Sequence, residues 1–360
     1  MDNATLQKFN KNVKSSQSSK APTFDKDLYD LHKKTSLEYS DRYAKIFPDR
    51  QKKADRIAMC SKYITWNVYK HKFETNLYKK DVKTMSCRDP FCSNCQFRKS
   101  RRLFTEMYHT LTYLETQKSK QFSYYFLTLT VRNPDLTDLR STIQKMSKAF
   151  RLMFNDSDAS IFKPIRRVVR GYYRTLEYLG SNTKSGEAHP HYHILLVMPK
   201  DYRPSRKEYI SAQQWQQMWK HALKVSYDPT IDIKRVRPSR KKGASHSAMV
   251  SAISEVTKYS VKPSDVLSLS DEDLRDLIIQ TKGVQTFSRS QHFRQMKDLL
   301  KLTPEQQKEE AKQWELILSE FYIFKDGSYH LKDRVYDLAS TEAKSMPLDK
   351  AQKSTRRVEP

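Results

Sequence analysis

The 360-residue sequence has few features of membrane, exported or motor proteins. No run of eighteen or more apolar residues occurs, so no segment is expected to span a bilayer. The first residues, MDNATLQKFNKNVKSSQSSKAP, lack the apolar core of a secretory signal, and we therefore expect a cytoplasmic protein. The GxxxxGK[ST] pattern of nucleotide-driven motors is also missing. These absences argue against a membrane-spanning protein, an exported protein and a motor.

Acidic side chains are scarce beside basic ones. The chain has 67 Lys and Arg against 41 Asp and Glu, which gives a net charge of +26. An excess of this size predicts a polyanionic partner, most simply nucleic acid. An anionic membrane surface is the alternative polyanion, but we expect no membrane partner.

The hydrophobic pattern predicts an α+β fold in which helices flank a mainly antiparallel sheet. Alternating or apolar segments predict strands at 122–133, 168–179, 191–199 and 230–238. Helical periodicity predicts helices at about 98–115, 137–154, 209–225 and 247–261. A hairpin is expected over 321–332, turning at Asp326-Gly327.

Histidine is scarce, with ten in the chain, yet three stand at alternate positions in HPHYHILLVM (189–198). Alternate residues of a strand share a face, so His191 and His193 project together while Tyr192 turns toward the core. Glu177, the single acidic residue of the neighbouring predicted strand, can lie opposite them. These three side chains are candidate ligands for Mg²⁺ or Mn²⁺. The alternative is a set of half-buried histidines with ordinary hydrogen bonds. His189 is a candidate for either a supporting or a substrate-side role.

A second candidate motif is EVTKYSVKPSD (255–265). On a helix, Glu255, Tyr259 and Lys262 would share one stripe. A phenolate can attack a phosphodiester and form a covalent phosphotyrosine, an ammonium can neutralise phosphate charge, and a carboxylate can act as a base. A solvated helix face is the alternative, because the chain has 21 tyrosines.

Two basic runs are candidate phosphate contacts. Either run could instead be solvated surface charge. Their candidate DNA-binding residues are Arg98, Lys99, Arg101, Arg102, Lys234, Arg235, Arg237, Arg240, Lys241 and Lys242.

Three motifs in order resemble those of the replication initiators of small rolling-circle plasmids, which are HUH endonucleases of the single-tyrosine branch. They are FLTLTVRN (126–133), HPHYHILLV (189–197) and EVTKYSVKPSD (255–265). The resemblance implies a sheet of about five antiparallel strands and a metal-dependent DNA nicking and strand-transfer enzyme. Tyr259 would keep the 5′ end of origin DNA covalently and leave a 3′-OH primer, and Glu255 would activate water for the terminating cleavage. It also implies a host helicase and a DNA polymerase as partners, and a homodimer is possible.

The family also carries cysteines upstream of its first motif. Here Cys87, Cys92 and Cys95 fall within nine residues, and Cys60 could complete a tetrahedral zinc site. His71 is an alternative fourth ligand, and four reduced thiols without metal remain the other interpretation.

These expectations divide the chain into five segments and leave two other functions open. A relaxase or transposase of the HUH type would share the chemistry, and a non-catalytic zinc-containing regulator would bind DNA without cleaving it. The segments are a flexible basic tail (1–35), a helical segment with the cysteines (36–120), the nicking domain (121–265), a helical extension (266–335) and a polar tail (336–360).

Overall fold

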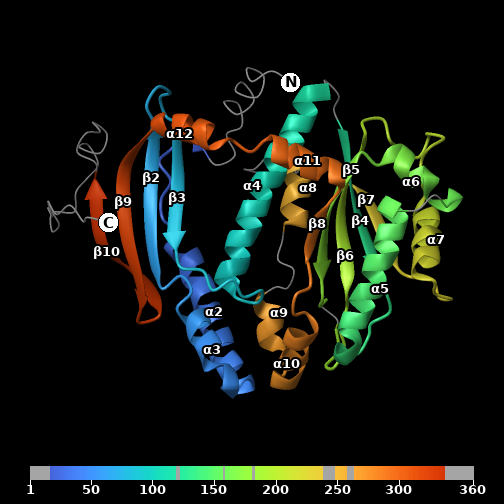
Figure 1. Cartoon of the computed structure of the whole chain (residues 1–360), viewed down its shortest axis with the longest axis horizontal. Coiled ribbons are helices and arrows are strands. Elements are labelled where there is room, and N and C mark those ends of the chain that lie inside the picture. The colour runs from blue at the N-terminus through green and yellow to red at the C-terminus, as the bar shows by residue number, and fades with distance from the viewer. Residues whose placement is uncertain are drawn as a thin grey trace. The chain divides into compact units, whose positions relative to one another are not determined.

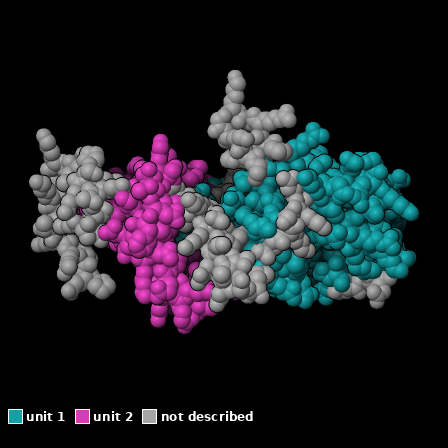
Figure 2. Space-filling view, turned by 90° about the horizontal axis from the view of Figure 1, so that it is seen from above, with its two compact units in different colours: residues 1–9, 97–300 teal, residues 10–96, 301–360 magenta. Residues whose placement is uncertain are grey.

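The computed structural model describes residues 17–118, 122–156, 159–180, 183–237, 248–257 and 263–336. The chain forms two compact units, coloured separately in Figure 2. Unit 1 consists of residues 1–9 and 97–300, and unit 2 of residues 10–96 and 301–360. Unit 2 is therefore built from segments near both ends of the sequence. Among the described residues, no helix is long and apolar enough to cross a membrane.

Unit 1 contains a five-stranded antiparallel sheet in the order β7-β4-β6-β5-β8 (Figure 1). Aromatic and β-branched residues make up most of the central strand β4, and most residues of its neighbour β6 are buried, as expected for a sheet covered on both faces. The predicted mixed fold with a helix-flanked antiparallel sheet is confirmed. The strands are β4 (Phe122–Thr130), β5 (Gly171–Glu177), β6 (His191–Pro199), β7 (Ile231–Arg235) and β8 (Phe287–Arg289).

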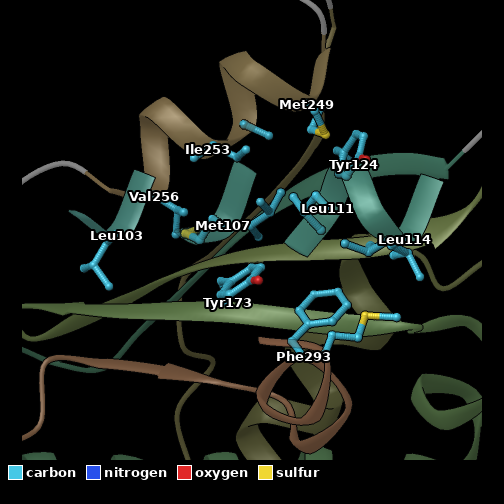
Figure 3. Close-up of a cluster of buried hydrophobic side chains, with 14 of the residues drawn as sticks. Leu103, Met107, Leu111, Leu114, Tyr124, Tyr173, Met249, Ile253, Val256 and Phe293 are labelled. Atoms are coloured by element: carbon cyan, nitrogen blue, oxygen red, sulfur yellow. The ribbon is translucent and has the colours of Figure 1, made fainter. Parts of the chain in front are cut away.

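Helices pack on both faces of this sheet. On one face, apolar side chains of α4, α8 and α11 form a core with Tyr173 and Leu195 (Figure 3). On the other face, α5 and α7 cover Tyr192, whose ring contacts those of Phe150 and Trp219. The helices of unit 1 are α4 (Ser93–Lys118, which begins in unit 2), α5 (Leu139–Arg151), α6 (Lys163–Val168), α7 (Ala212–Leu223), α8 (Ala248–Val256), α9 (Pro263–Ser268), α10 (Asp271–Gln280) and α11 (Gln291–Leu299), with short helical turns η2 (Leu136–Asp138), η3 (Leu152–Asp156) and η4 (Ser160–Phe162).

Unit 2 contains a second antiparallel sheet, in the order β1-β3-β2-β9-β10. Helix α2 and the preceding Phe24 cover one face, where Trp66, Val68 and Leu318 are buried. The strands are β1 (Gln17–Ser18), β2 (Tyr63–His71), β3 (Tyr78–Thr84), β9 (Trp314–Lys325) and β10 (Ser328–Tyr336). The helices are α2 (Lys26–Ile46), η1 (Pro48–Arg50), α3 (Gln51–Ala58) and α12 (Pro304–Lys312).

The predicted segments need three corrections. The expected tail over 1–35 is wrong from Lys26 onward, because Asp25 caps α2 by accepting from the backbone N–H of Leu28. The strand expected at 168–179 begins only at Gly171, because Pro164 starts the short helix α6. The extension over 266–335 is not purely helical, since it also supplies β8, β9 and β10.

The two compact units also cut across the expected segment boundaries at 120 and 265. The physical reason is strand pairing, because β2 pairs with β9 across some 250 residues of sequence. The hairpin turn at Asp326-Gly327 is confirmed, with positive φ of 50° and 77° at its two residues. Of the expected polar tail (336–360), Tyr336 ends β10, and residues 337–360 lie outside the described residues.

Candidate active site and cysteine cluster

The strand register brings Glu177, His191 and His193 together at one end of the unit 1 sheet. Glu177 of β5 lies directly opposite His191 of β6. The two histidine Nε2 atoms are 3.1 Å apart, and each lies 3.4 Å from one carboxylate oxygen of Glu177. The three residues predicted as metal ligands therefore meet at one point, and we call them the triad.

Each imidazole of the triad has a polar partner behind it. Nδ1 of His191 lies 2.7 Å from the backbone oxygen of His189, which can only accept, so Nδ1 carries the proton and the Nε2 lone pair faces the triad. Nδ1 of His193 lies 3.3 Å from Oγ1 of Thr128. Sequence reasoning missed Thr128, although its place in FLTLTVRN, opposite His193 in the register, is the signal that could have identified it.

His189 is not part of the triad but supports it. Its Nδ1 lies 2.7 Å from Oδ1 of Asn133, and its ring lies 4.8 Å from the ring of His191, centroid to centroid. A Cβ placed on Gly180 would lie 3.0 Å from the His189 ring, so a side chain at this position would press against that ring. The role of His189, supporting or substrate-side, stays a prediction.

The triad carries a negative charge in a half-buried setting. Burial alone would raise the pKa of the Glu177 carboxyl, but hydrogen bonds and charge from His191 and His193 outweigh burial and lower that pKa to about 2. Glu177 is therefore ionised at neutral pH. When both imidazoles are unprotonated at Nε2, the triad offers one anionic oxygen and two neutral nitrogen donors, a set that suits a divalent cation.

The spacing of the donors also fits one ion. Adjacent donors about 2.1 Å from an octahedral ion lie about 3 Å apart. The Nε2 atoms of His191 and His193 are 3.1 Å apart, and all donor atoms of the triad lie within 4.8 Å of one another. The three side chains could hold one cation on one of its faces and leave its other positions open.

Helix α8 packs on the sheet face that carries the triad. Met249, Ile253 and Val256 are buried against the core of unit 1, and Figure 3 shows them pointing from α8 toward α4. Glu255 is exposed on the same helix. Tyr259 and Lys262 lie outside the described residues.

A chain of hydrogen bonds links the end of α8 to β5. Ser100 donates to the carbonyl of Thr257 at 2.6 Å, and the neighbouring Lys99 donates to Oγ1 of Thr286 at 2.8 Å. The carbonyl of Thr286 accepts from the N–H of Leu176 at 2.8 Å, immediately before Glu177. These hydrogen bonds connect Thr257, where the polypeptide leaves α8, to the strand that carries Glu177. Thr257 lies two residues before Tyr259 in sequence.

The four cysteines of unit 2 form a second cluster. The Sγ of Cys95 lies 3.6 Å from that of Cys60 and 3.5 Å from that of Cys87. All four Sγ atoms, including that of Cys92, lie within 4.8 Å of one another. Ligands about 2.3 Å from a tetrahedral zinc ion lie about 3.8 Å apart, so this spacing suits Zn²⁺.

Cys60, not His71, completes the cysteine cluster. His71 is occupied elsewhere, where its Nδ1 accepts from the N–H of Glu74 at 3.0 Å. Lys33 is 1% exposed, and its ammonium donates to the carbonyl of Cys60 at 2.8 Å. A cation next to the cluster offsets the negative charge that four thiolates would bring to a metal.

The predicted basic runs differ in exposure. Lys99 bonds to Thr286 and Arg98 is half-buried, whereas Arg101 and Arg102 are exposed. In the second run Lys234 pairs with Asp232 at 2.8 Å, and Arg235 donates to Ser123 at 3.4 Å. Arg237 is exposed. Arg240, Lys241 and Lys242 lie outside the described residues.

Comparison with known proteins indicates the family to which the chain with these two sites belongs. A family model described as "Replication protein" matches residues 78–336, which contain the triad and three of the four cysteines. The chain belongs to the replication protein family. This confirms the family that the three ordered motifs indicated, and it assigns the protein a part in plasmid replication.

Several relatives of this replication protein are named "Protein rep". One from Bacillus sp is 31% identical over 230 residues, covering 61% of this chain and 69% of the relative. One from Staphylococcus aureus is 27% identical over 242 residues, covering 66% of this chain and 96% of the relative. One from Lentilactobacillus hilgardii is 28% identical over 242 residues, covering 67% and 70%. No solved structure matches the chain.

Proposed function

We propose that this replication protein initiates rolling-circle replication by nicking one strand of plasmid origin DNA. The observation that carries the proposal is the triad, in which Glu177, His191 and His193 aim their donor atoms at one point. The triad lies on the sheet face that α8 covers, and Tyr259 follows α8 in sequence. A metal-binding triad and a tyrosine nucleophile supply the two parts that such a cleavage needs.

The proposed reaction transfers a phosphodiester to tyrosine. The phenolic oxygen of Tyr259 attacks the phosphorus, a tyrosine–phosphate bond forms, and the bond from phosphorus to the 3′ oxygen breaks. The phenolic proton ends on the departing 3′ oxygen, so the products are a 5′-phosphotyrosine and a free 3′-OH. A Mg²⁺ or Mn²⁺ ion held by the triad would polarise the scissile phosphate.

The remaining residues of the third motif have separate roles in the proposal. Lys262 would neutralise charge on the phosphate, and Glu255 would take a proton from the water that ends the reaction. The exposure of Glu255 on α8 supports this, because a base for water must be accessible. The 3′-OH would be extended by a host DNA polymerase, with a host helicase unwinding the duplex.

We also propose that the cysteine cluster holds a structural Zn²⁺. Four protein ligands in a closed set are typical of structural zinc, whereas catalytic zinc keeps one position open. The sulfur spacing and the buried Lys33 support this assignment.

The test of nicking is an incubation of the full chain with supercoiled plasmid that carries the cognate origin, in the presence of Mn²⁺. Nicked circles with protein attached to the 5′ end are expected. Tyr259→Phe should abolish the adduct and retain DNA binding, while Tyr63→Phe, a matched change at an exposed tyrosine of unit 2, should cleave normally. An adduct that persists in Tyr259→Phe would refute the assignment of the nucleophile.

Two further variants separate the roles within the site. His191→Ala with His193→Ala should remove metal-dependent cleavage, and unchanged nicking would refute the triad as the metal site. Glu255→Ala should still nick but release its product poorly, and normal termination would remove its proposed role. Origin binding with no cleavage by the wild-type chain would instead favour a non-catalytic regulator.

A further inference from the structure

Helix α7 presents an exposed stripe of amide side chains on a rigid support. Its buried side is anchored by Trp215 and Trp219, and Trp219 donates its indole N–H to the carbonyl of Thr130 at 2.8 Å. On the opposite side, Gln213 and Gln217 are exposed and one turn apart. The helix sequence, AQQWQQMWKHAL, contains no acidic residue. Such a face can approach a polyanion without repulsion.

The exposed amides differ from the other glutamines of α7. Gln214 closes the capping box with Ser211, and Gln216 donates to the carbonyl of Pro229 at 3.0 Å. The side-chain amides of Gln213 and Gln217 make no hydrogen bond to another residue in the part of the chain that the structure describes. Each keeps a donor and an acceptor available, which is the pairing that adenine presents in the major groove.

Two segments that share a hollow with α7 are rich in basic side chains. The segments 163–170 and 200–208 carry eight exposed basic residues and two acidic ones, and both acidic residues, Asp201 and Glu208, pair with Arg206. We call this set the basic shell. Its basic members are Lys163, Arg166, Arg167, Arg170, Lys200, Arg203, Arg206 and Lys207.

A hollow of about 580 Å³ separates α6 from α7 and joins the basic shell to the glutamine stripe. Arg167 and Lys207 stand at it beside Gln213 and Gln217. Four apolar side chains also line it, Ile161, Pro164, Ile210 and Met218, together with Tyr209, Gln214 and Glu208, whose carboxylate pairs with Arg206. Apolar surface next to amides is the combination that contacts the methyl group of thymine beside adenine.

We infer that α7 docks in the major groove of duplex DNA, where Gln213 and Gln217 contact base edges and the basic shell contacts phosphates. The groove is wide enough for one helix. The 200–208 part of the shell follows β6, and the eight residue steps from His191 to Pro199 along that strand span about 26 Å. The duplex contact is therefore separate from the strand that the triad would cleave. The inference rests on the proposed function only in taking DNA as the ligand.

The test is selection of duplexes from a randomised 30-base-pair pool by the full-length protein. The wild type should select a preferred sequence. Gln213→Ala and Gln217→Ala should each relax the sequence preference at one base pair. The two affected positions should be about two base pairs apart, because one turn of the protein helix rises about 6 Å and a base pair about 3.4 Å. Each variant should weaken binding to the selected duplex about tenfold. Arg167→Ala with Lys207→Ala should weaken binding to all duplexes alike. The slope of log affinity against log salt concentration should fall by about two.

The matched control is Gln291→Ala with Gln295→Ala, which removes two exposed amides at the same spacing on α11 of the same unit. Wild-type selection and affinity in the α7 variants would overturn the inference, as would an equal loss in the α11 control or no preferred sequence for the wild type. Cleavage of a single-stranded origin oligonucleotide should stay unchanged in the α7 variants. If the wild type fails to cleave it, nicking is refuted while the duplex result stands on its own.

Discussion

At the scale of single residues, the triad depends on groups that hold its imidazoles. The backbone oxygen of His189 fixes the tautomer of His191, and Thr128 lies behind His193. Such partners orient a ligand and raise its basicity, so their loss weakens metal binding even though they never touch the ion.

Thr128→Val should therefore weaken activation by Mn²⁺ about 10- to 100-fold while the fold is kept. A titration of cleavage against Mn²⁺ concentration, with direct measurement of Mn²⁺ binding, checks this. Thr130→Val is the matched control, because the hydroxyl of Thr130 donates to the carbonyl of Thr230 at 2.7 Å and not to an imidazole. Equal Mn²⁺ dependence in the two variants would contradict the role given to Thr128.

A second residue-scale prediction concerns Gly171, at the start of β5. A Cβ placed there would lie 2.4 Å from the ring of Phe293, which is fully buried in the core of unit 1. Gly171→Ala should lower the free energy of unfolding by about 1–3 kcal/mol through overpacking. Chemical denaturation of the single variants and of Gly171→Ala with Phe293→Leu measures it. The double variant should lose less than the sum of the two single losses, and strict additivity would contradict a steric clash.

At the scale of elements, the periodicity of the sequence predicted which face of a strand is buried, but not which strands pair with each other. Alternation within HPHYHILLVM placed His191 and His193 on one face and Tyr192 in the core, because strand parity is a local property. The second sheet escaped prediction because β2 pairs with β9, far away in sequence. Only the first part of α2, residues 26–35, falls in the predicted tail, because it is polar, yet its Lys33 and Asp30 are buried.

Asp30 illustrates why the polar composition of α2 misled. Its carboxylate accepts from the backbone N–H of Tyr329 at 2.6 Å and from the hydroxyl of Ser328, at the turn side of the β9–β10 hairpin. Burial raises the pKa of the Asp30 carboxyl, but hydrogen bonds from Ser328 and Tyr329 lower it more. The ionised form is thus the one that holds α2 to the hairpin.

Asp30→Ala should destabilise unit 2 by about 1–3 kcal/mol, because it leaves the buried N–H of Tyr329 without its acceptor. Asp30→Asn should lose less, since an amide oxygen can still accept. The ionised Asp30 carboxylate stabilises the fold at pH values above its unfolded pKa of about 3.9. This stabilisation is lost as the pH falls through the lowered pKa of the folded state. The stability of Asp30→Asn should therefore depend less on pH at the acid end. Urea unfolding of wild type and both variants from pH 7 to pH 3 measures this, and equal losses in both variants would contradict it.

At the scale of the whole molecule, the two candidate metal sites lie in different compact units. The triad lies in unit 1, and the cysteine cluster lies in unit 2. The residues after Cys60 bind the C-terminal hairpin, because Tyr329 donates its hydroxyl to Ser61 and the N–H of Phe324 donates to the carbonyl of Lys62 at 2.9 Å. A metal at the cysteines would therefore stabilise segments from both ends of the chain.

Removing zinc should thus loosen unit 2 and spare unit 1. We expect a zinc-selective chelator, added with excess Mg²⁺, to raise amide hydrogen exchange in residues 26–96 and 301–336 together, because structural zinc contributes folding free energy directly. Peptides from β4 and β6 should keep their protection. Cys95→Ser should show the raised exchange without chelator, and elemental analysis should find less zinc in it. If a protein shown to have lost its zinc keeps the same amide exchange, the zinc has no structural role. If exchange rises equally in β4 and β6, zinc removal does not act on unit 2 alone.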